Sequence, residues 1–309
     1  MINYILTIIL IFAVAPFLTG LIKSIKMYLL FKKPISPFQP YVDFSKLIHK
    51  EIILSKEASF ITKYGAIFVL APIVLTVFFL PPIFHGSFFV SFIDAFTITG
   101  LLSLSTFFLM LIGLDSASAF GGIGASREAF ISALVEPAMI LTIFAISLIG
   151  GNISISKAAL NLSHHIDINY IASFVLAAIS FFIILIAENG RIPVDNPETH
   201  LELTMVHEAM ILDLTGANLA LIESASSFKF AIFASLYATL FLPFGANLCW
   251  CLAVVVFILK LILISVAVAL IEVNTAKLRL FKVPNLLGVA IVFAFLSLFI
   301  YYILGANNA

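Results

Sequence analysis

Long uninterrupted runs of apolar residues dominate this 309-residue sequence, in which 62% of residues are hydrophobic and only 10% are charged. Soluble proteins do not have this composition. About 20 apolar residues cross a hydrocarbon core of roughly 30 Å, where backbone groups must be hydrogen bonded within a helix or a closed barrel. Barrel strands alternate apolar with polar residues, and these runs do not. The sequence therefore predicts an all-α, polytopic integral membrane protein.

Charged residues and Gly- or Pro-containing breaks divide the apolar runs into eight predicted transmembrane helices. We expect them to form a single membrane domain over residues 1–309. Lys23 and Lys26 follow the first run instead of preceding it, so we expect it to be a retained span and not a signal peptide. The predicted spans are 2–22, 64–84, 92–114, 130–150, 169–187, 228–244, 248–271 and 285–304.

The basic residues predict the orientation, because Lys and Arg favour cytoplasmic loops. Those outside the predicted spans lie almost entirely in the first, third, fifth and seventh loops, with Lys157 alone on the other side. These four loops are therefore predicted to be cytoplasmic and both termini to lie outside. Because the same loops carry nearly all the polar chemistry, we expect a partner to dock there.

Charge and cysteine content exclude several classes of site. The formal net charge is zero, which indicates no nucleic acid partner. The two cysteines, Cys249 and Cys251, lie within an apolar run and lack metal-ligand spacing, so we interpret them as packing residues. We therefore predict no metal and no cofactor bound by this chain.

The densest polar segment covers residues 187–216 and reads AENGRIPVDNPETHLELTMVHEAMILDLTG. Asn196 before Pro197 is typical of a helix start. If that helix continues to Gly216, its acids form a stripe and its histidines, His200 and His207, lie nearly opposite. The stripe residues would be Glu198, Glu202 and Asp213.

Two interpretations of this stripe stay open. Crowded carboxylates raise one another's pKa, as a proton relay requires. Alternatively, a solvated helix simply presents its acids to water or to a partner's basic residues. We expect Arg191 to form a structural ion pair with Glu188 or Asp195, and the two histidines to be surface residues instead of metal ligands.

Glu136 is predicted to lie roughly 10 Å inside the fourth span. A carboxyl group at that depth must be protonated, paired or hydrated, and an ionised one costs about 2.5–3.5 kcal/mol at mid-membrane, so we treat it as a functional candidate. The alternative is a protonated side chain bonded to a backbone carbonyl beside Pro137. Asp94, Glu223, Lys260 and Glu272 lie near predicted span ends, where reaching to the interface explains them.

Two cytoplasmic loops are predicted to have defined shapes. Residues 34–51, PISPFQPYVDFSKLIHKE, contain an amphipathic run that predicts an interfacial helix with its apolar side against lipid. Residues 113–128, GLDSASAFGGIGASRE, follow a membrane helix and not a strand. We therefore interpret this glycine-rich segment as a tight protein-contact turn and not as a nucleotide site.

Together these segments resemble the membrane subunits of formate hydrogenlyase and related energy-converting [NiFe]-hydrogenases (hydrogenase-4 component C type), homologous to the Complex I subunit beside the quinone cavity. The resemblance covers nearly the whole chain and looks closer to the hydrogenase branch. It rests on SPFQPYVDFSKLIHKE (36–51), GLDSASAFGGIGASRE (113–128), Glu136-Pro137, GRIPVDNPETHLELTMVHEAM (190–210), LALIE (219–223) and AKLRLFKVPNLLG (276–288).

The resemblance implies a non-catalytic coupling subunit in a bacterial or archaeal cytoplasmic membrane. Its implied partners are hydrogenase-like large and small subunits, iron–sulfur proteins of a peripheral arm, and antiporter-like membrane subunits beside it in the lipid bilayer. A quinone is not named as a cofactor. Alternatives from other classes are an ion transporter working without redox partners and a passive membrane anchor.

The resemblance also assigns residue roles. Glu136 matches the family's buried fourth-span acid, and the implied relay set is Glu136, Glu188, Arg191, Asp195, Glu198, Glu202, Glu208 and Asp213. The implied docking set is Gln39, Pro40, Asp43, Arg127, Lys277 and Arg279. The chain departs from the family in two places: it has Asp213-Leu214-Thr215-Gly216 where Glu-Tyr-Ser-Gly is common, and Phe31-Lys32-Lys33 before the first-loop prolines.

Overall fold

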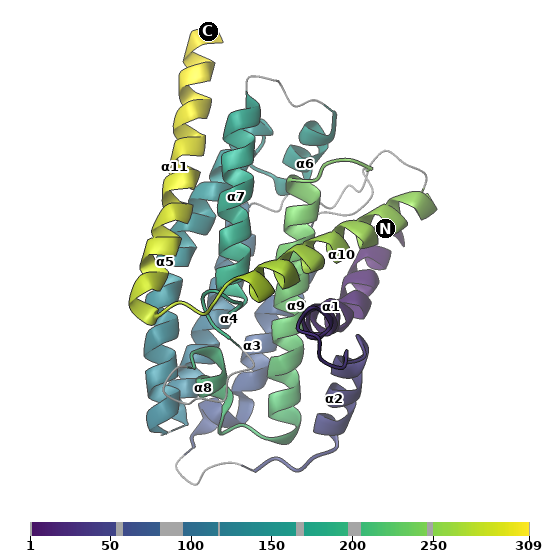
Figure 1. Cartoon of the computed structure of the whole chain (residues 1–309), viewed down its shortest axis with the longest axis vertical. Helices are drawn as coiled ribbons and strands as arrows, with labels where there is room; N and C mark the ends of the chain where they lie inside the picture. The colour runs from purple at the N-terminus through teal and green to yellow at the C-terminus, as the bar shows by residue number, and fades with distance from the viewer. Residues whose placement is uncertain are drawn as a thin grey trace.

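The computed structural model is a bundle of long helices joined by loops that carry three short helices and a 3-10 turn (Figure 1). It describes residues 2–53, 58–80, 95–116, 118–164, 170–196, 205–245 and 250–308. The elements are α1 (Ile2–Leu29), α2 (Gln39–Ile48), α3 (Phe60–Phe78), α4 (Ala95–Asp115), α5 (Ala119–Ile149), α6 (Ile155–His164), α7 (Ile171–Glu188), α8 (His207–Ile211), α9 (Gly216–Leu240), α10 (Trp250–Asn274), η3 (Leu280–Lys282) and α11 (Val283–Asn308).

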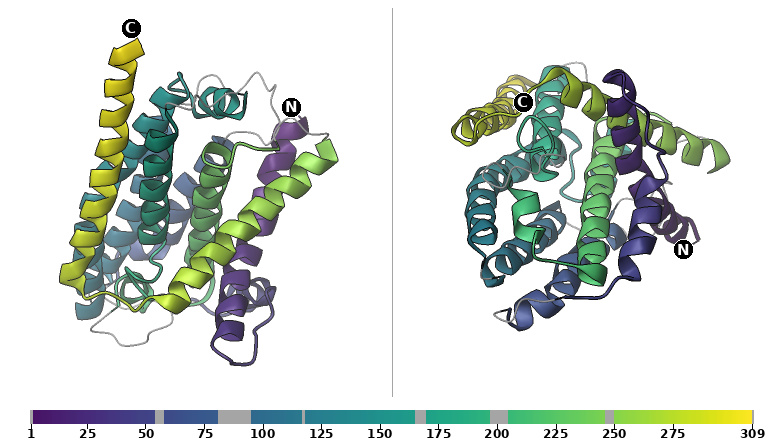
Figure 2. Two further views of the ribbon diagram at one scale, coloured as in Figure 1. Left: turned by 45° about the horizontal axis from the view of Figure 1, so that its top comes forward. Right: turned by 60° about the horizontal axis from the view of Figure 1, so that its bottom comes forward.

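Eight of these helices, α1, α3, α4, α5, α7, α9, α10 and α11, are long and apolar enough to span a membrane. The prediction of eight spans is therefore confirmed within the described residues. Both termini lie toward the same end of the bundle, as an even number of spans requires (Figures 1 and 2). Which side of the membrane they face stays a prediction.

The bundle is assembled from pairs of neighbouring helices. α3 packs against α4 and α9, α11 packs against α7 and α5, and α1 packs against α10 and α9. α10 runs obliquely across one face of the molecule (Figures 1 and 2). Aromatic side chains of α7 and α9 fill the space between them, with the Phe181 and Phe233 ring centroids 6.0 Å apart and the Phe181 and Phe241 centroids 5.6 Å apart.

The glycine-rich segment 113–128 is mostly helical, so its prediction as a tight turn was wrong. α4 ends at Asp115, and α5 begins at Ala119 after the Ser118 hydroxyl accepts a hydrogen bond from the Gly121 N–H. A Cβ at Gly124 would lie 2.9 Å from the Val206 carbonyl oxygen. The glycine therefore lets the segment before α8 pack directly on α5.

α9 begins at Gly216, well before the predicted start of that span at 228. A run from 216 contains Glu223 and Lys229, and these charges had suggested a loop. In the fold both side chains border an internal cavity, so the helix continues through them. Neither residue therefore lies at a span end, where the sequence had placed it.

The predicted helix in the first loop is present as α2, and none of its side chains is buried. Its placement in the membrane interface stays a prediction. α2 packs against α1 and α9 and thereby closes one side of the cavity described next.

Candidate functional site

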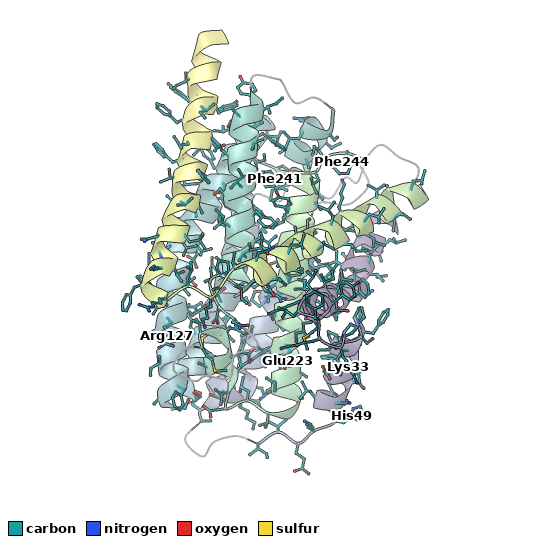
Figure 3. The ribbon with its side chains drawn as sticks, in the orientation of Figure 1. Lys33, His49, Arg127, Glu223, Phe241 and Phe244 are labelled. Carbon is teal, nitrogen blue, oxygen red and sulfur yellow. The ribbon has the colours of Figure 1, made fainter. Side chains whose placement is uncertain are left out.

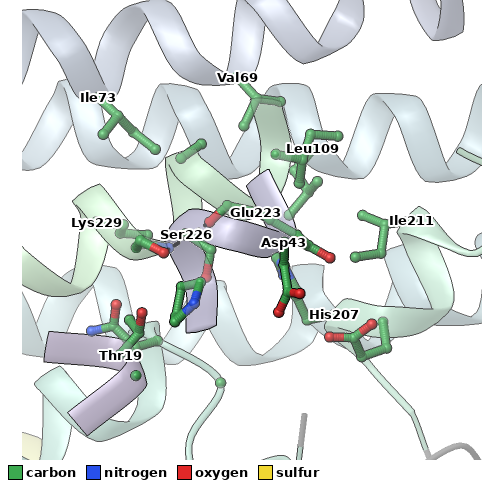
Figure 4. Close-up of a pocket in the computed structure, with 18 of the residues that line it drawn as sticks. Thr19, Asp43, Val69, Ile73, Leu109, His207, Ile211, Glu223, Ser226 and Lys229 are labelled. Carbon is green, nitrogen blue, oxygen red and sulfur yellow. Dashed lines mark hydrogen bonds between the residues drawn. The ribbon is translucent and has the colours of Figure 1, made fainter. Parts of the chain in front are cut away.

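A cavity of about 510 Å³ lies between α1, α2, α3, α4 and α9, and α5, the end of α7 and the start of α8 also contribute to its wall (Figure 4). Its wall changes from exposed charges beside α1 and α2 to buried or half-buried charges at the inner end. The ionisable side chains that line it are Lys23, Asp43, Lys46, Lys50, Glu128, Glu188, Arg191, His207, Glu208, Glu223 and Lys229.

An ion pair between α7 and α9 lies at the inner end of the cavity. Lys229 Nζ is 3.2 Å from Glu188 Oε2 and also donates to Thr106 Oγ1 on α4 at 3.3 Å. The side chain of Glu188 is 2% exposed, and its other oxygen, Oε1, is buried without a hydrogen-bond partner among the described residues. A buried carboxylate oxygen without a donor is costly, so Oε1 is suited to accept a hydrogen bond from a donor in the cavity.

Arg191 forms a second buried ionic contact. Its guanidinium is 3.4 Å from Glu272 Oε1 on α10, and Lys26 Nζ on α1 is 3.5 Å from Glu272 Oε2. The guanidinium also lies 5.4 Å from the centre of the Phe230 ring. Arg191 thus has the predicted structural role with a different partner, because α10 brings Glu272 to it while Glu188 pairs with Lys229. The expectation that Glu272 reaches the interface was wrong, since its side chain is 1% exposed.

Asp195 anchors the loop that follows α7. Its carboxylate accepts from Lys277 Nζ at 2.6 Å and from the backbone N–H groups of Val206 and His207, each at 3.3 Å. Arg127 on α5 donates to the Met205 carbonyl at 2.9 Å. These contacts hold the chain on both sides of residues 197–204 against α5 and the loop before α11.

Residues 205–216 do not form the continuous helix that the sequence suggested. α8 ends at Ile211, a turn follows, and α9 starts at Gly216, so Asp213 lies exposed on the turn and not on a stripe. Glu198, Glu202 and His200 lie outside the described residues. The bend places the first residues of α8 against the cavity instead of in solvent.

His207 and Glu208, at the start of α8, have opposite pKa shifts. Burial, followed by the nearby charge of Lys229, lowers the pKa of His207 to about 4. Burial, followed by the charge of Glu223, raises the pKa of Glu208 to about 7. His207 is therefore a neutral cavity residue and not the surface histidine we predicted. Glu208 can hold or release a proton near neutral pH.

The remaining predicted residues are scattered. Glu136 is half-buried in α5, forms no hydrogen bond or ion pair with the described residues, and is not among the side chains lining the cavity. Gln39, Pro40 and Asp43 line the cavity mouth, where the Gln39 amide donates to Asp43 at 2.8 Å. Arg279 is exposed.

Sequence reasoning missed Glu128, Lys229 and Glu272 as members of this ionic interior. Glu128 was interpreted only as a loop residue. Lys229 was placed at the start of a predicted span, because the start of that span was set too late, at residue 228. Moving that start to Gly216 would have revealed a lysine in mid-helix, which is a recognised sign of a functional intramembrane site.

The comparisons with known proteins agree with this architecture. A family model described as NADH dehydrogenase matches residues 4–303, nearly the whole chain. The chain belongs to this NADH dehydrogenase family. The match includes every described residue that lines the cavity.

Two curated proteins are also similar over most of this chain. Hydrogenase-4 component C of Escherichia coli K12 is 30% identical over 269 residues, covering 85% of this chain and 84% of the relative. Formate hydrogenlyase subunit 4 of the same organism is 28% identical over 292 residues, covering 93% and 94%. This chain is thus similar to a component of hydrogenase-4 and to a subunit of formate hydrogenlyase.

A solved structure shows the same fold. A chain of the membrane-bound sulfane sulfur reductase, an archaeal respiratory membrane complex, superposes with a TM-score of 0.82, covering 96% of this chain and 98% of that one at 19% identity. At this identity the similarity concerns the fold alone.

Proposed function

We propose that this chain is the membrane coupling subunit of a redox-driven ion pump of the hydrogenase or Complex I type. In this proposal a peripheral arm with hydrogenase-like large and small subunits and iron–sulfur proteins docks on the cytoplasmic loops. The chain relays protons or conformational energy to antiporter-like membrane subunits beside it. The chain itself is non-catalytic, lies in a bacterial or archaeal cytoplasmic membrane, and has both termini outside.

The observation that carries the proposal is the cavity. It joins the exposed charges beside α2 to the buried pair Glu188–Lys229, so a change at the loops has a polar route into the bundle. A membrane anchor needs no such interior, because buried charges are costly in a bilayer. The names of the curated relatives, a hydrogenase component and a formate hydrogenlyase subunit, support the choice of partners.

The bend around α8 supports the coupling step. Asp195 is held by Lys277, and the same carboxylate binds the backbone at His207, whose ring lines the cavity. A shift of the loops around residue 195 would therefore move His207 and Glu208 relative to Glu188. Because the pKa of Glu208 is near 7, such a shift can change its charge at neutral pH.

The test is to purify the complex from native membranes and to reconstitute it into proteoliposomes. The hydrogenase-like module is driven with reduced methyl viologen, and proton and sodium uptake are followed with sensitive dyes. We expect the Glu188→Gln variant to assemble and to evolve hydrogen while losing most ion uptake. Glu51→Gln is the matched control, because Glu51 is exposed and outside the cavity wall.

Two outcomes would overturn the proposal. Normal ion uptake by the Glu188→Gln complex would leave a passive membrane anchor as the better description. Vectorial ion flux by the isolated chain, with no copurifying iron–sulfur or hydrogenase-like subunit, would identify an independent transporter.

A further inference from the structure

The cap at the C-terminal end of α1 has an unusual residue at its central position. The Lys32 N–H bonds to the Met27 carbonyl and the Phe31 N–H bonds to the Tyr28 carbonyl, at 3.0 and 3.1 Å. These two bonds form a Schellman cap, whose left-handed position is usually glycine. Here Phe31 occupies that position with φ of 56°. A bulky residue with this φ is strained, so the cap would form more readily with glycine.

The Phe31 side chain makes no internal packing that would offset this backbone strain. The Phe31 side chain is 100% exposed, so its ring buries no apolar surface against the rest of the chain. A strained, fully exposed aromatic residue is therefore a candidate for a contact outside the chain.

The surroundings of Phe31 identify the chemistry of that contact. We call residues 28–38 the elbow. Tyr28, Leu30 and Phe38 are 71%, 43% and 60% exposed, and the neighbouring Lys32 and Lys33 are exposed without an ion pair to any described residue. Figure 3 shows Lys33 beside α1, near the edge of the molecule. The elbow thus combines apolar rings with two free positive charges.

Its position matches the membrane interface. The candidate span of α1, assigned by length and composition, ends at Leu29, so the elbow begins at the end of this apolar helix. Aromatic rings are enriched at this level of the bilayer, and basic residues beside them attract anionic headgroups.

α2 extends the same surface. Gln39, Asp43 and Lys46 line the cavity together with Pro40 and Leu47, whereas Phe44 and Ile48 are not among its lining residues and are 37% and 46% exposed. A helix whose polar face points inward and whose apolar face points outward is suited to contact with lipid and not with water.

We propose that the elbow is a binding site for an anionic phospholipid of the bilayer. The Lys32 and Lys33 ammonium groups bind the phosphate of the headgroup. The Phe31 ring inserts at the boundary between headgroups and acyl chains. This contact offsets the strain of Phe31 and holds the α1–α2 corner, which forms part of the cavity mouth, at a fixed depth in the membrane.

The test uses the full chain purified in a neutral detergent and depleted of lipid. Phosphatidylglycerol and phosphatidylcholine are titrated separately, and bound lipid is counted by native mass spectrometry. We expect phosphatidylglycerol to bind more tightly, and the double variant Lys32→Gln/Lys33→Gln to lose affinity by about 30-fold. Lys157→Gln, an exposed lysine on α6, is the matched charge control and should bind as the parent chain does.

Phe31→Gly separates lipid binding from folding. In lipid-depleted detergent it should raise the midpoint of thermal unfolding, because glycine relieves the strained cap. The same variant should bind phosphatidylglycerol more weakly than the parent chain. Soluble glycerol phosphate, which has the charge without the acyl chains, should not stabilise either protein.

Four results would overturn the site. They are equal binding of the two lipids, unchanged affinity of the double lysine variant, stabilisation by glycerol phosphate alone, or a lower unfolding midpoint for Phe31→Gly in lipid-depleted detergent. If the elbow variants instead lose a copurifying subunit and keep their lipid, the surface binds protein and the lipid proposal fails.

Discussion

Lys229 Nζ lies 3.2 Å from Glu188 Oε2 at the inner end of the cavity, and the two side chains are 13% and 2% exposed. The pair joins α7 to α9, and its contact with Thr106 adds α4. Because Glu188 Oε1 has no hydrogen-bond partner in the part of the chain that the structure describes, the pair is only partly satisfied by these residues. A partly satisfied ionic group beside a cavity is a focus for both stability and function.

Replacing Lys229 by Met should lower the free energy of unfolding by about 3–5 kcal/mol, because Glu188 is left as an unpaired buried charge. The double variant Glu188→Gln/Lys229→Met should recover much of that loss. Thermal unfolding of the four proteins in one detergent gives a double-mutant cycle. Simply additive single effects would show that the two side chains do not interact.

Glu272→Gln should also destabilise the protein by about 3–5 kcal/mol. Glu272 is the shared counterion of Lys26 and Arg191, and its loss removes the negative charge between two buried cations. The control is Glu51→Gln, which removes an exposed carboxylate and should change stability by less than about 0.5 kcal/mol. If both variants lost the same free energy of unfolding, the buried ionic contact of Glu272 would be contradicted.

His207 and Glu208 should make opposite contributions to the pH dependence of stability. The pKa of His207 is lowered to about 4, so its contribution is lost as pH falls from about 6.5 to 4. The pKa of Glu208 is raised to about 7, so its contribution is lost as pH rises from about 4.5 to 7. Each amounts to on the order of 3 kcal/mol, and in the parent chain the two nearly cancel between about pH 4.5 and 6.5.

Single variants should reveal the two opposing pH dependences of stability. Glu208→Gln should become more stable as pH rises from 4.5 to 6.5, and His207→Gln should become less stable over the same interval. Unfolding midpoints recorded at about half-unit steps of pH measure both trends. Two variants with the same slope as the parent chain would show that neither group is shielded from water in the fold.

Gly20→Ala should destabilise the α1–α2 corner by about 1–3 kcal/mol. A Cβ at this position would collide with the backbone carbonyl of Pro37 in the first loop and lie 2.9 Å from the Pro40 side-chain atom Cδ on α2. Gly100→Ala on α4 is the control, because a Cβ there meets no atom within 4 Å. Its stability should be unchanged or up to about 1 kcal/mol higher, as unfolding in detergent will show.

The span predictions were accurate where apolar runs were long and were wrong where charges interrupted a helix. The span predicted at 169–187 became α7 at Ile171–Glu188, whereas the span predicted from 228 begins at Gly216. Hydropathy treats Glu223 and Lys229 as loop residues, because it scores each side chain against lipid. In the fold both line a cavity bounded by other helices. There Glu223 is exposed, and the cost of burying Lys229 is offset by its contacts with Glu188 and Thr106.

The sequence alone determined that this is an eight-helix membrane protein and, through its motifs, which family it resembles, because apolar length and residue order are local properties of a chain. Only the tertiary structure decided that Arg191 pairs with Glu272 instead of Glu188, and that Lys229 forms an ion pair with Glu188. These partners come from α9 and α10, far along the chain, and ionic partners inside a membrane are chosen by which helices pack together.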